Sequence, residues 1–323
     1  MTRPSPSERC IAPRRNARGF TLIELMVALA LTLLVAIVAA ASLQVARRGH
    51  TTTDAASQLL DNARFAADAI QKLAGQVGYL DADIASETES GGFVVAGMAA
   101  AEPFVQGQDD AIYPSGAKGI NGSDILVLRS QASALVPGST QSDGTMLDCM
   151  GARIDELPAN RSDASVSMLF LRVGSDGEPS LMCAAGVTKS GVTTMEPTIQ
   201  PIVQGVETFQ VLYGVDGVLP NTRPVGTGDS VAERYLRASQ MVVPGDVEGT
   251  QLNWQRVRSL RIGLVLRGAP NSAQDRTIRT TLFPLGEALS AADDVGARFV
   301  PALDGRFRQV LTFAVNLHNR QQL

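Results

Sequence analysis

The chain has 323 residues, a formal net charge of −4, 45% hydrophobic residues and only 5% aromatic residues. This length is enough for one large or two small domains with a hydrophobic core. The acidic balance and the scarcity of aromatic residues disfavour nucleic acid as a partner, because phosphates bind dense basic surfaces and single strands stack on aromatic side chains.

The charge is unevenly distributed along the chain. Residues 1–19 hold five arginines against one acidic residue, Glu8, and so carry a net charge of +4. The other residues therefore carry −8. A basic segment ahead of an apolar span stays on the cytoplasmic side of a membrane, so we expect the later part of the chain on the opposite side.

An apolar run extends from Phe20 to Ala41 and is interrupted only by Thr21, Glu24 and Thr32. As a helix of 22 residues it would span about 33 Å, enough to cross the hydrocarbon core of a bilayer. A carboxylate inside such a helix costs a few kcal/mol near the bilayer centre. Glu24 is therefore a candidate functional residue.

Three interpretations of this segment compete. A secretory signal peptide would end at a small-residue site such as 39–41, but its apolar region usually has about 7–15 residues. A plain membrane anchor would explain the length and leave Glu24 unexplained. The third interpretation uses the junction at Gly19 and Phe20, where residues 19–25 read Gly-Phe-Thr-Leu-Ile-Glu-Leu. This motif strongly resembles the type III signal of type IV pilins and pseudopilins.

The resemblance implies how the N-terminus is processed. A prepilin peptidase would cut between Gly19 and Phe20 on the cytoplasmic side and methylate the new N-terminal Phe20. The apolar helix would stay on the mature protein. In this family the carboxylate at the position of Glu24 is thought to pair with the N-terminal amine of a neighbouring subunit. Such a pair would offset the desolvation of both charges.

Helical periodicity continues through residues 44–78. Apolar residues recur at spacings of three and four on one face, and charges of alternating sign follow the opposite face. The apolar set is Ala56, Leu59, Leu60, Ala63, Ala66, Ala67, Ile70, Leu73, Ala74 and Val77, and the charged set is Asp61, Arg64, Asp68 and Lys72. Gly78 is a suitable helix stop. The pattern predicts one helix over residues 20–77, with Gly49 as the point where it would bend.

From Tyr79 the chain changes to short β-rich runs separated by Gly, Ser, Asp and Pro. Predicted strands cover 124–129, 166–170, 209–213, 260–266 and 310–317. A helix followed by many strands indicates an α+β fold with a mainly antiparallel sheet. Residues 81–122 and 214–255 lack periodicity, so we expect long excursions there.

Several landmarks resemble the PilW-type minor pilins in particular, and they occur in the expected order over nearly the whole mature chain. They are residues 62–66 (Asn-Ala-Arg-Phe-Ala), 78–79, 122–127 (the family's first body strand), 213–216, 233–236, Trp254 with 257–262, and 313–320. The implied organisation is a removed leader (1–19), a transmembrane and filament-core helix (20–43), an amphipathic helical half (44–78) and a periplasmic β-rich head (79–323).

Three cysteines occur, of which Cys10 lies in the basic leader. Cys149 and Cys183 are 34 positions apart in the head, and a pair left after leader removal indicates a disulfide in an oxidising compartment. Two unrelated buried thiols are the alternative.

The sequence offers little for catalysis or metal binding. The only histidines are His50 and His318, which argues against a histidine metal site or a Ser-His-Asp triad. Ser115 to Lys118 matches Ser-x-x-Lys by letter only, in a predicted loop. The acidic pairs at 109–110 and 293–294 and the Asp-Gly pair at 216–217 lack the ligand spacing of an EF-hand, and Asp-Gly is more often a turn. We therefore expect no enzyme activity, no catalytic residue, no cofactor and no metal.

The sequence thus predicts a PilW-like minor pilin that takes part in type IV pilus assembly or priming near the pilus tip. It would lie in the inner membrane with its head in the periplasm and then enter the pilus fibre. The resemblance implies as partners other minor and major pilins, the prepilin peptidase, the inner-membrane assembly platform and, as a further candidate, a tip adhesin. The alternatives are a minor pseudopilin of a type II secretion system, a soluble periplasmic binding protein released by signal peptidase, and, more weakly, a secreted hydrolase.

Overall fold

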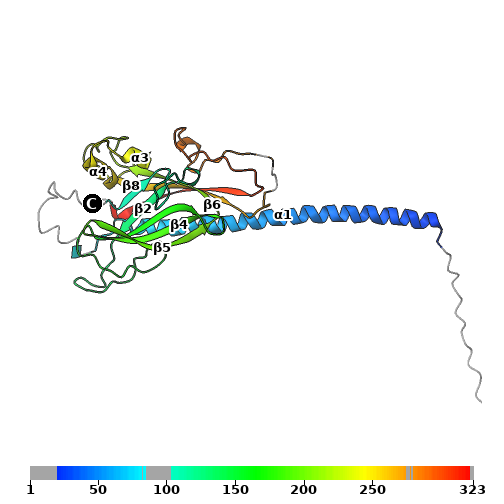
Figure 1. Ribbon diagram of the computed structural model, residues 1–323, viewed down its shortest axis with the longest axis horizontal. Coiled ribbons are helices and arrows are strands. Elements are labelled where there is room, and N and C mark those ends of the chain that lie inside the picture. Colours follow the sequence, from blue (N-terminus) through cyan, green and yellow to red (C-terminus); the bar gives the residue numbers. More distant parts are fainter. Residues whose placement is uncertain (1–19, 82, 85–102, 274–276, 278, 321–323) are drawn as a thin grey trace, which may run out of the picture. The chain divides into compact units, whose positions relative to one another are not determined.

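The computed structural model describes residues 20–81, 83–84, 103–273, 277 and 279–320 (Figure 1). The chain divides into two compact units, Met1–His50 and Thr51–Leu323. The predicted leader, with Gly19 and Cys10, lies outside the described residues.

The first helix, α1, spans Leu22–Gln76, close to the predicted range of 20–77, and continues through Gly49. In the first unit its described side chains are exposed on every side. In the second unit one face is buried, and most of it belongs to the predicted apolar stripe: Leu59, Ala63, Ala66, Ile70, Leu73 and Ala74, with Val77 just after the helix. Two positions differ from the prediction, because Ala55 is buried outside the predicted stripe and Leu60 within it is 38% exposed. The helix ends as expected, because Gly78 takes the left-handed conformation (φ 74°) that closes a helix at low cost.

The head contains two antiparallel sheets, not one. The first has the order β1-β2-β3-β4-β5 and the second the order β7-β6-β8-β9. The strands of the first sheet are β1 (Val105–Gln108), β2 (Ile125–Ser130), β3 (Ala164–Val173), β4 (Pro179–Lys189) and β5 (Val192–Gln204). Those of the second are β6 (Val206–Val215), β7 (Arg234–Leu236), β8 (Val257–Arg267) and β9 (Arg308–Asn316). The predicted α+β fold is confirmed.

Gly205 alone separates β5 from β6, where the chain leaves one sheet for the other. Its φ of 76° favours glycine, and a Cβ there would lie 2.8 Å from the carbonyl oxygen of Arg267. Gly205 also makes a hydrogen bond to each sheet: its N–H donates to the carbonyl of Pro179 on β4, and its carbonyl accepts from the N–H of Arg267 on β8. This tight turn brings β4 of one sheet next to β8 of the other.

One main core joins α1 to both sheets. Ile70 of α1 packs in the same buried cluster as Leu126 and Leu181 of the first sheet and Phe209 and Leu264 of the second. A smaller cluster on the other side of the first sheet contains Ala111, Ile125, Phe170, Met182 and Ala184. The amphipathic half of α1 is therefore an integral part of the folded unit.

The two predicted excursions are only partly irregular. Residues 81–122 include β1 and the 3₁₀ turn η1 (Ile120–Gly122), so the strand expected to come first, β2, is preceded by β1. Residues 214–255 include β7 and the helices α3 (Ala238–Met241) and α4 (Val247–Gln255). β1, η1, β7 and α3 have three or four residues, which is too few for a readable period. α4 has nine residues, but its buried residues are Gly249, Asn253 and Trp254, which do not form an apolar stripe.

Two short 3₁₀ turns complete the described elements, η2 (Glu287–Leu289) and η3 (His318–Arg320). The predicted strand at 310–317 is observed one or two residues earlier, as β9. The predicted strands at 124–129, 166–170, 209–213 and 260–266 lie within or overlap β2, β3, β6 and β8, and are confirmed.

Candidate functional site

The N-terminal turn of α1 is held by two residues that cap each other. The N–H and the hydroxyl of Thr21 both donate to Oε2 of Glu24, at 2.9 and 3.0 Å. In return the N–H of Glu24 points at Oγ1 of Thr21, at 3.3 Å. This reciprocal arrangement is a capping box, which satisfies amide donors that have no partner inside the helix. Thr-x-x-Glu is readable in the sequence, so this second role of Glu24 was available there and was missed.

The capping box leaves part of the Glu24 carboxylate open. Both bonds from Thr21 go to Oε2, and within the described residues Oε1 has no hydrogen-bond partner. A carboxylate can accept about four hydrogen bonds, so a cation can approach Oε1 without opening the cap. Phe20 precedes the helix with 89% of its surface exposed. In this uncleaved chain its nitrogen belongs to a peptide bond, so no amine is present to test the predicted pair.

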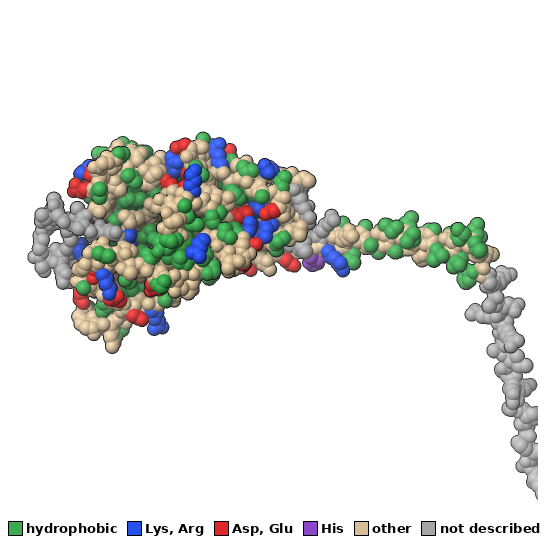
Figure 2. Space-filling model, viewed as in Figure 1, with side chains coloured by type: hydrophobic (Ala, Val, Ile, Leu, Met, Phe, Trp, Pro, Cys, Tyr) green, Lys and Arg blue, Asp and Glu red, His purple; other side chains and the backbone are tan. Residues whose placement is uncertain are grey.

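The first half of α1 presents apolar side chains on all its faces. Figure 2 shows those on one face in green. Fifteen large hydrophobic side chains from Phe20 to Val45 are exposed there: Phe20, Leu22, Ile23, Leu25, Met26, Val27, Leu29, Leu31, Leu33, Leu34, Val35, Ile37, Val38, Leu43 and Val45. A helix that is apolar all round is stable only inside a membrane or among other proteins. Among the described residues, α1 alone is long and apolar enough to cross a membrane.

Cys149 and Cys183 form a disulfide, with their Cα atoms 5.8 Å apart. Cys183 is fully buried on β4, while Cys149 lies in the long connection between β2 and β3 and packs against the core. The N–H of Cys149 also donates to the hydroxyl of Ser167 on β3, at 3.0 Å. The bridge therefore fastens the connection between β2 and β3 onto the first sheet.

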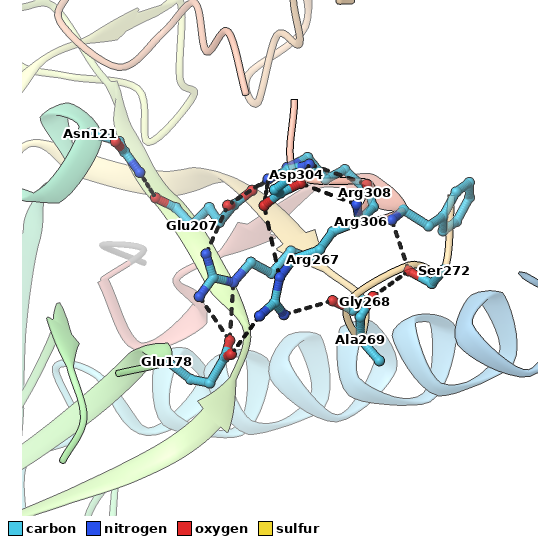
Figure 3. A network of polar contacts seen from close by, with 11 residues as sticks. Asn121, Glu178, Glu207, Arg267, Gly268, Ala269, Ser272, Asp304, Arg306 and Arg308 are labelled. Carbon is cyan, nitrogen blue, oxygen red and sulfur yellow. Dashed lines mark hydrogen bonds and ion pairs between the residues drawn. The ribbon is translucent and has the colours of Figure 1, made fainter. Parts of the chain in front are cut away.

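A network of three arginines and three acidic side chains joins the two sheets (Figure 3). Glu178, next to β4, accepts hydrogen bonds from Arg267 at the end of β8 (2.8 and 3.0 Å) and from Arg306 (2.9 Å). Burial alone would raise the pKa of Glu178, but the two guanidinium groups outweigh it and lower the pKa.

The second half of this ion network centres on Arg308, at the start of β9. Arg308 donates to Glu207 of β6 at 2.6 and 3.0 Å, and to Asp304 at 2.8 Å from each of two nitrogens. Glu207 also faces Arg267 at 3.3 Å. The three positive and three negative groups balance, and every carboxylate faces an arginine. The network therefore stabilises the fold and has no free group for chemistry.

Asp124, from the motif at 122–127, is buried between the sheets. Its N–H donates to the carbonyl of Phe209, and its carboxylate accepts from the N–H groups of Val211 (2.8 Å) and Asp110 (3.1 Å). Burial, and next the charge of Asp109, raise the pKa of Asp124 well above its usual range. This aspartate thus connects the start of β2 to β6 and serves the architecture.

Asp216, Asp229 and Glu233 bring three carboxylates close enough to suggest a cation. However, Arg256 and Arg258 face Asp216 at 3.8 and 3.4 Å, so positive charge is already supplied. Asp216 also accepts from the N–H groups of Asp229 and Ser230. The cluster is explained as the anchor of a turn, which agrees with the sequence interpretation of Asp216.

The remaining sequence candidates do not come together. Ser115 lies in an exposed turn, where its hydroxyl accepts from the N–H of Ala117 (3.3 Å), as expected for a chance match to Ser-x-x-Lys. His50 lies on α1 and His318 in η3, after β9. Trp254 is buried and packs edge-on against Tyr213, with ring centroids 4.8 Å apart. These placements leave the start of α1 as the candidate functional site.

Two family models match the chain. Residues 14–40 match the prokaryotic N-terminal methylation motif, and residues 168–319 match the type IV pilus-assembly protein W family. The chain belongs to the PilW family of type IV pilins. The first match contains the junction at Gly19 and Phe20 together with the capping box of this pilin. The second extends from β3 to η3 and contains most of both sheets.

Among solved structures, this pilin is similar to a type IV-like pilin from Thermus thermophilus, with 12% sequence identity and a TM-score of 0.39. The similarity covers 82% of this chain and 97% of that chain. The comparison with curated proteins gives no match.

Proposed function

We propose that this pilin is a minor pilin that takes part in assembling or priming the type IV pilus, near the tip of the fibre. The observation that carries the proposal is the start of α1, where an apolar surface exposed on every side lies largely within the matched methylation motif and contains one carboxylate, Glu24. Such a surface needs a membrane and then other subunits to cover it. The pilin would act by association with other minor and major pilins.

The same proposal assigns the processing of the chain. The prepilin peptidase cuts between Gly19 and Phe20, Phe20 becomes N-methylated, and residues 20–43 hold the protein in the inner membrane until the assembly platform extracts it. The basic leader keeps the N-terminus cytoplasmic, so the head is periplasmic. The disulfide between Cys149 and Cys183 supports this location, since disulfides persist in oxidising compartments. A tip adhesin is a further candidate partner.

Glu24 has two roles in this proposal. Through Oε2 it caps its own helix, and through Oε1 it pairs with the N-terminal amine of a neighbouring subunit. In an apolar surrounding each charge offsets the desolvation of the other, so the pair fixes the axial register between subunits. No step of this function is catalytic and none requires a cofactor. Every charged group described above in the ion network and around Asp216 has a structural partner, which supports a role other than an enzyme.

The test is to sequence the N-terminus of the mature protein and to look for the chain in purified pili. An N-methylated Phe20, with the protein present in sheared fibres, is the expected result. A mature protein that starts at Ser42 would instead indicate a soluble periplasmic protein released by signal peptidase. Loss of protein secretion with normal twitching motility, after deletion, would indicate a pseudopilin of a type II secretion system.

A further inference from the structure

An exposed sheet edge carries unpaired N–H and C=O groups, and proteins protect such edges with short strands, prolines, irregular register or covering segments. Three of the four edges in this head are protected. β1 has four residues with α3 and α4 against it, and β7 has three residues. β5 carries Pro197 and Pro201, and its pairing with β4 has two register shifts.

Among the residues that the structure describes, none of these protections is found at the fourth edge, β9. Its nine residues, Arg308–Asn316, contain no proline, and they pair with β8 in one unbroken register. Its single charged residue is Arg308, whose guanidinium is held by Glu207 and Asp304. Of the edges described, β9 is therefore the one whose backbone is regular enough to accept another strand.

The hydrogen bonds at both ends of β9 show which of its groups face outward. Gly268 donates to the carbonyl of Phe307, and Leu317 donates to the carbonyl of Arg258, in the same register. Because bonded and non-bonded pairs alternate in an antiparallel ladder, residues 309, 311, 313 and 315 bond to β8. The N–H and C=O groups of the even-numbered residues, from Val310 to Asn316, point away from β8. Among the described residues these N–H groups have no partner.

The side chains of β9 are also incompletely covered. Leu311, Phe313 and Val315 pack against the main core but remain only partly buried, and they form its rim. On the other face Ala314 and Asn316 are exposed. An added strand would extend the sheet and cover this apolar rim, if its own side chains alternate between apolar on the core side and polar on the other side.

The direction of β9 disfavours a symmetric pair of two copies. Thr52 of α1 donates to Ser272, whose hydroxyl accepts from Phe307 just before β9. After β9, the amide of Asn319 donates to the carbonyl of Gly75 of α1. β9 thus runs in the same direction as residues 52–75 of α1. If β9 strands of two copies paired antiparallel around a two-fold axis, residues 52–75 of the two copies would also run in opposite directions. This arrangement does not suit two subunits whose apolar segments are held in one membrane.

We propose that β9 is an assembly edge, on which an extended strand of a different pilin adds to the second sheet. The inference rests on the proposed function, since it takes its partner from the same fibre. The partner strand would bond to the outward N–H and C=O groups of Val310, Thr312 and Ala314 and cover Phe313. Backbone bonds give such a contact its strength, and the alternating side chains give its specificity.

The experiment places the photo-cross-linking amino acid benzoylphenylalanine at Ala314 in the full-length protein, in cells that make pili. A control places it at Thr198, which is exposed on the protected edge β5. The expected result is an adduct at position 314 with a protein that carries its own N-terminal methylation motif, located by mass spectrometry in an extended segment. Benzoylphenylalanine at position 198 should give at least about tenfold less of this adduct than at position 314.

Two variants test the backbone bonds. Ala314→Pro removes an outward N–H without removing a bond to β8, so folding should be unchanged while incorporation into pili falls. Ala314→Lys keeps the N–H and adds a charge to the edge, as natural edges do, and Thr198→Lys is its matched control. Only the two variants at position 314 should reduce incorporation.

The outcomes separate the two proposals. Adducts only with a second copy of this chain, or none at position 314 while the pilin is present in fibres, would overturn the assembly edge and leave the proposed function standing. Equal losses from Ala314→Lys and Thr198→Lys would also overturn it. If the chain is absent from fibres, the proposed function fails. An adduct with another pilin in the inner membrane would then still support strand pairing at β9.

Discussion

The backbone nitrogen of Thr21 lies 2.9 Å from Oε2 of Glu24, and the nitrogen of Glu24 lies 3.3 Å from Oγ1 of Thr21. One carboxylate therefore caps the helix that it is also proposed to align with its neighbours. A substitution that removes both roles, such as Glu24→Val, should leave cleavage intact and impair incorporation into the fibre, but it does not tell the two roles apart.

Glu24→Gln and Thr21→Val separate the charge from the cap. Glutamine keeps an oxygen acceptor for the capping box and loses the charge, so we expect normal cleavage at Gly19 and roughly tenfold or greater loss of incorporation into pili. Valine at position 21 keeps the shape of threonine and loses only the hydroxyl of the cap, which costs about 1 kcal/mol of helix stability. Immunoblots of sheared pili against total protein measure both. Equal defects would contradict the charge pair.

Reduction of the disulfide between Cys149 and Cys183 should destabilise the second unit. The bridge closes a loop of 34 positions, which in the chain-entropy model contributes about 3–4 kcal/mol to the free energy of unfolding. Thermal unfolding of the purified protein with and without reductant measures the difference. The oxidised protein should also migrate faster on a non-reducing gel and show no titratable thiol at either position after denaturation.

Glu207→Gln should weaken the contact between the two sheets. The Glu207 side chain is 7% exposed and faces Arg267 and Arg308, so its neutralisation leaves Glu178 as the remaining counter-charge of Arg267 and Asp304 as that of Arg308. We expect a loss of about 1–3 kcal/mol in the free energy of unfolding, the usual cost of removing one partner of a buried polar group. Asp68→Asn is the control, because Asp68 pairs with Lys72 on the exposed face of α1. Its effect should stay within about 0.5 kcal/mol, measured in the same denaturant titration.

The stability of the second unit should rise as the pH falls from 7 to about 5. Burial raises the pKa of Asp294 to about 6, against an ordinary value of 3.8, with Arg237 opposing the shift. The folded protein therefore takes up a proton before the unfolded chain does, and the stabilisation is lost as the pH rises toward 6. Asp124 acts in the same direction. Glu178 and Asp304, whose pKa values are lowered, oppose this only at more acidic pH.

Asp294→Asn tests this pH dependence. The variant should lose part of the rise in melting temperature between pH 7 and pH 5, and the remainder should reflect Asp124. If the melting temperature of the variant rises between pH 7 and pH 5 by as much as that of the unchanged protein, Asp294 does not titrate in this range. The melting temperature at closely spaced pH values is the measurement.

The local pattern of the sequence predicted much of this protein. The stripe from Leu59 to Val77 has a helical period over several turns, so α1 and its buried face follow from the sequence alone. The junction at Gly19 and Phe20 with Glu24 is a contiguous motif, and it predicted the family. The strands at β2, β3, β6 and β8 are long enough to show their composition or alternation. Each of these signals lies within one short segment of chain.

Contacts between distant segments were decided only by the tertiary structure. The division into two sheets depends on a single turn at Gly205, and the network at Glu178 joins residues that lie 89 and 128 positions away. The exposed edge of β9 depends on which strands flank it, which no periodicity records. Sequence fixes the intrinsic preference of each segment, but the partner of a strand or a charge is chosen by the packing of the whole head, because burial and desolvation depend on all the neighbours at once.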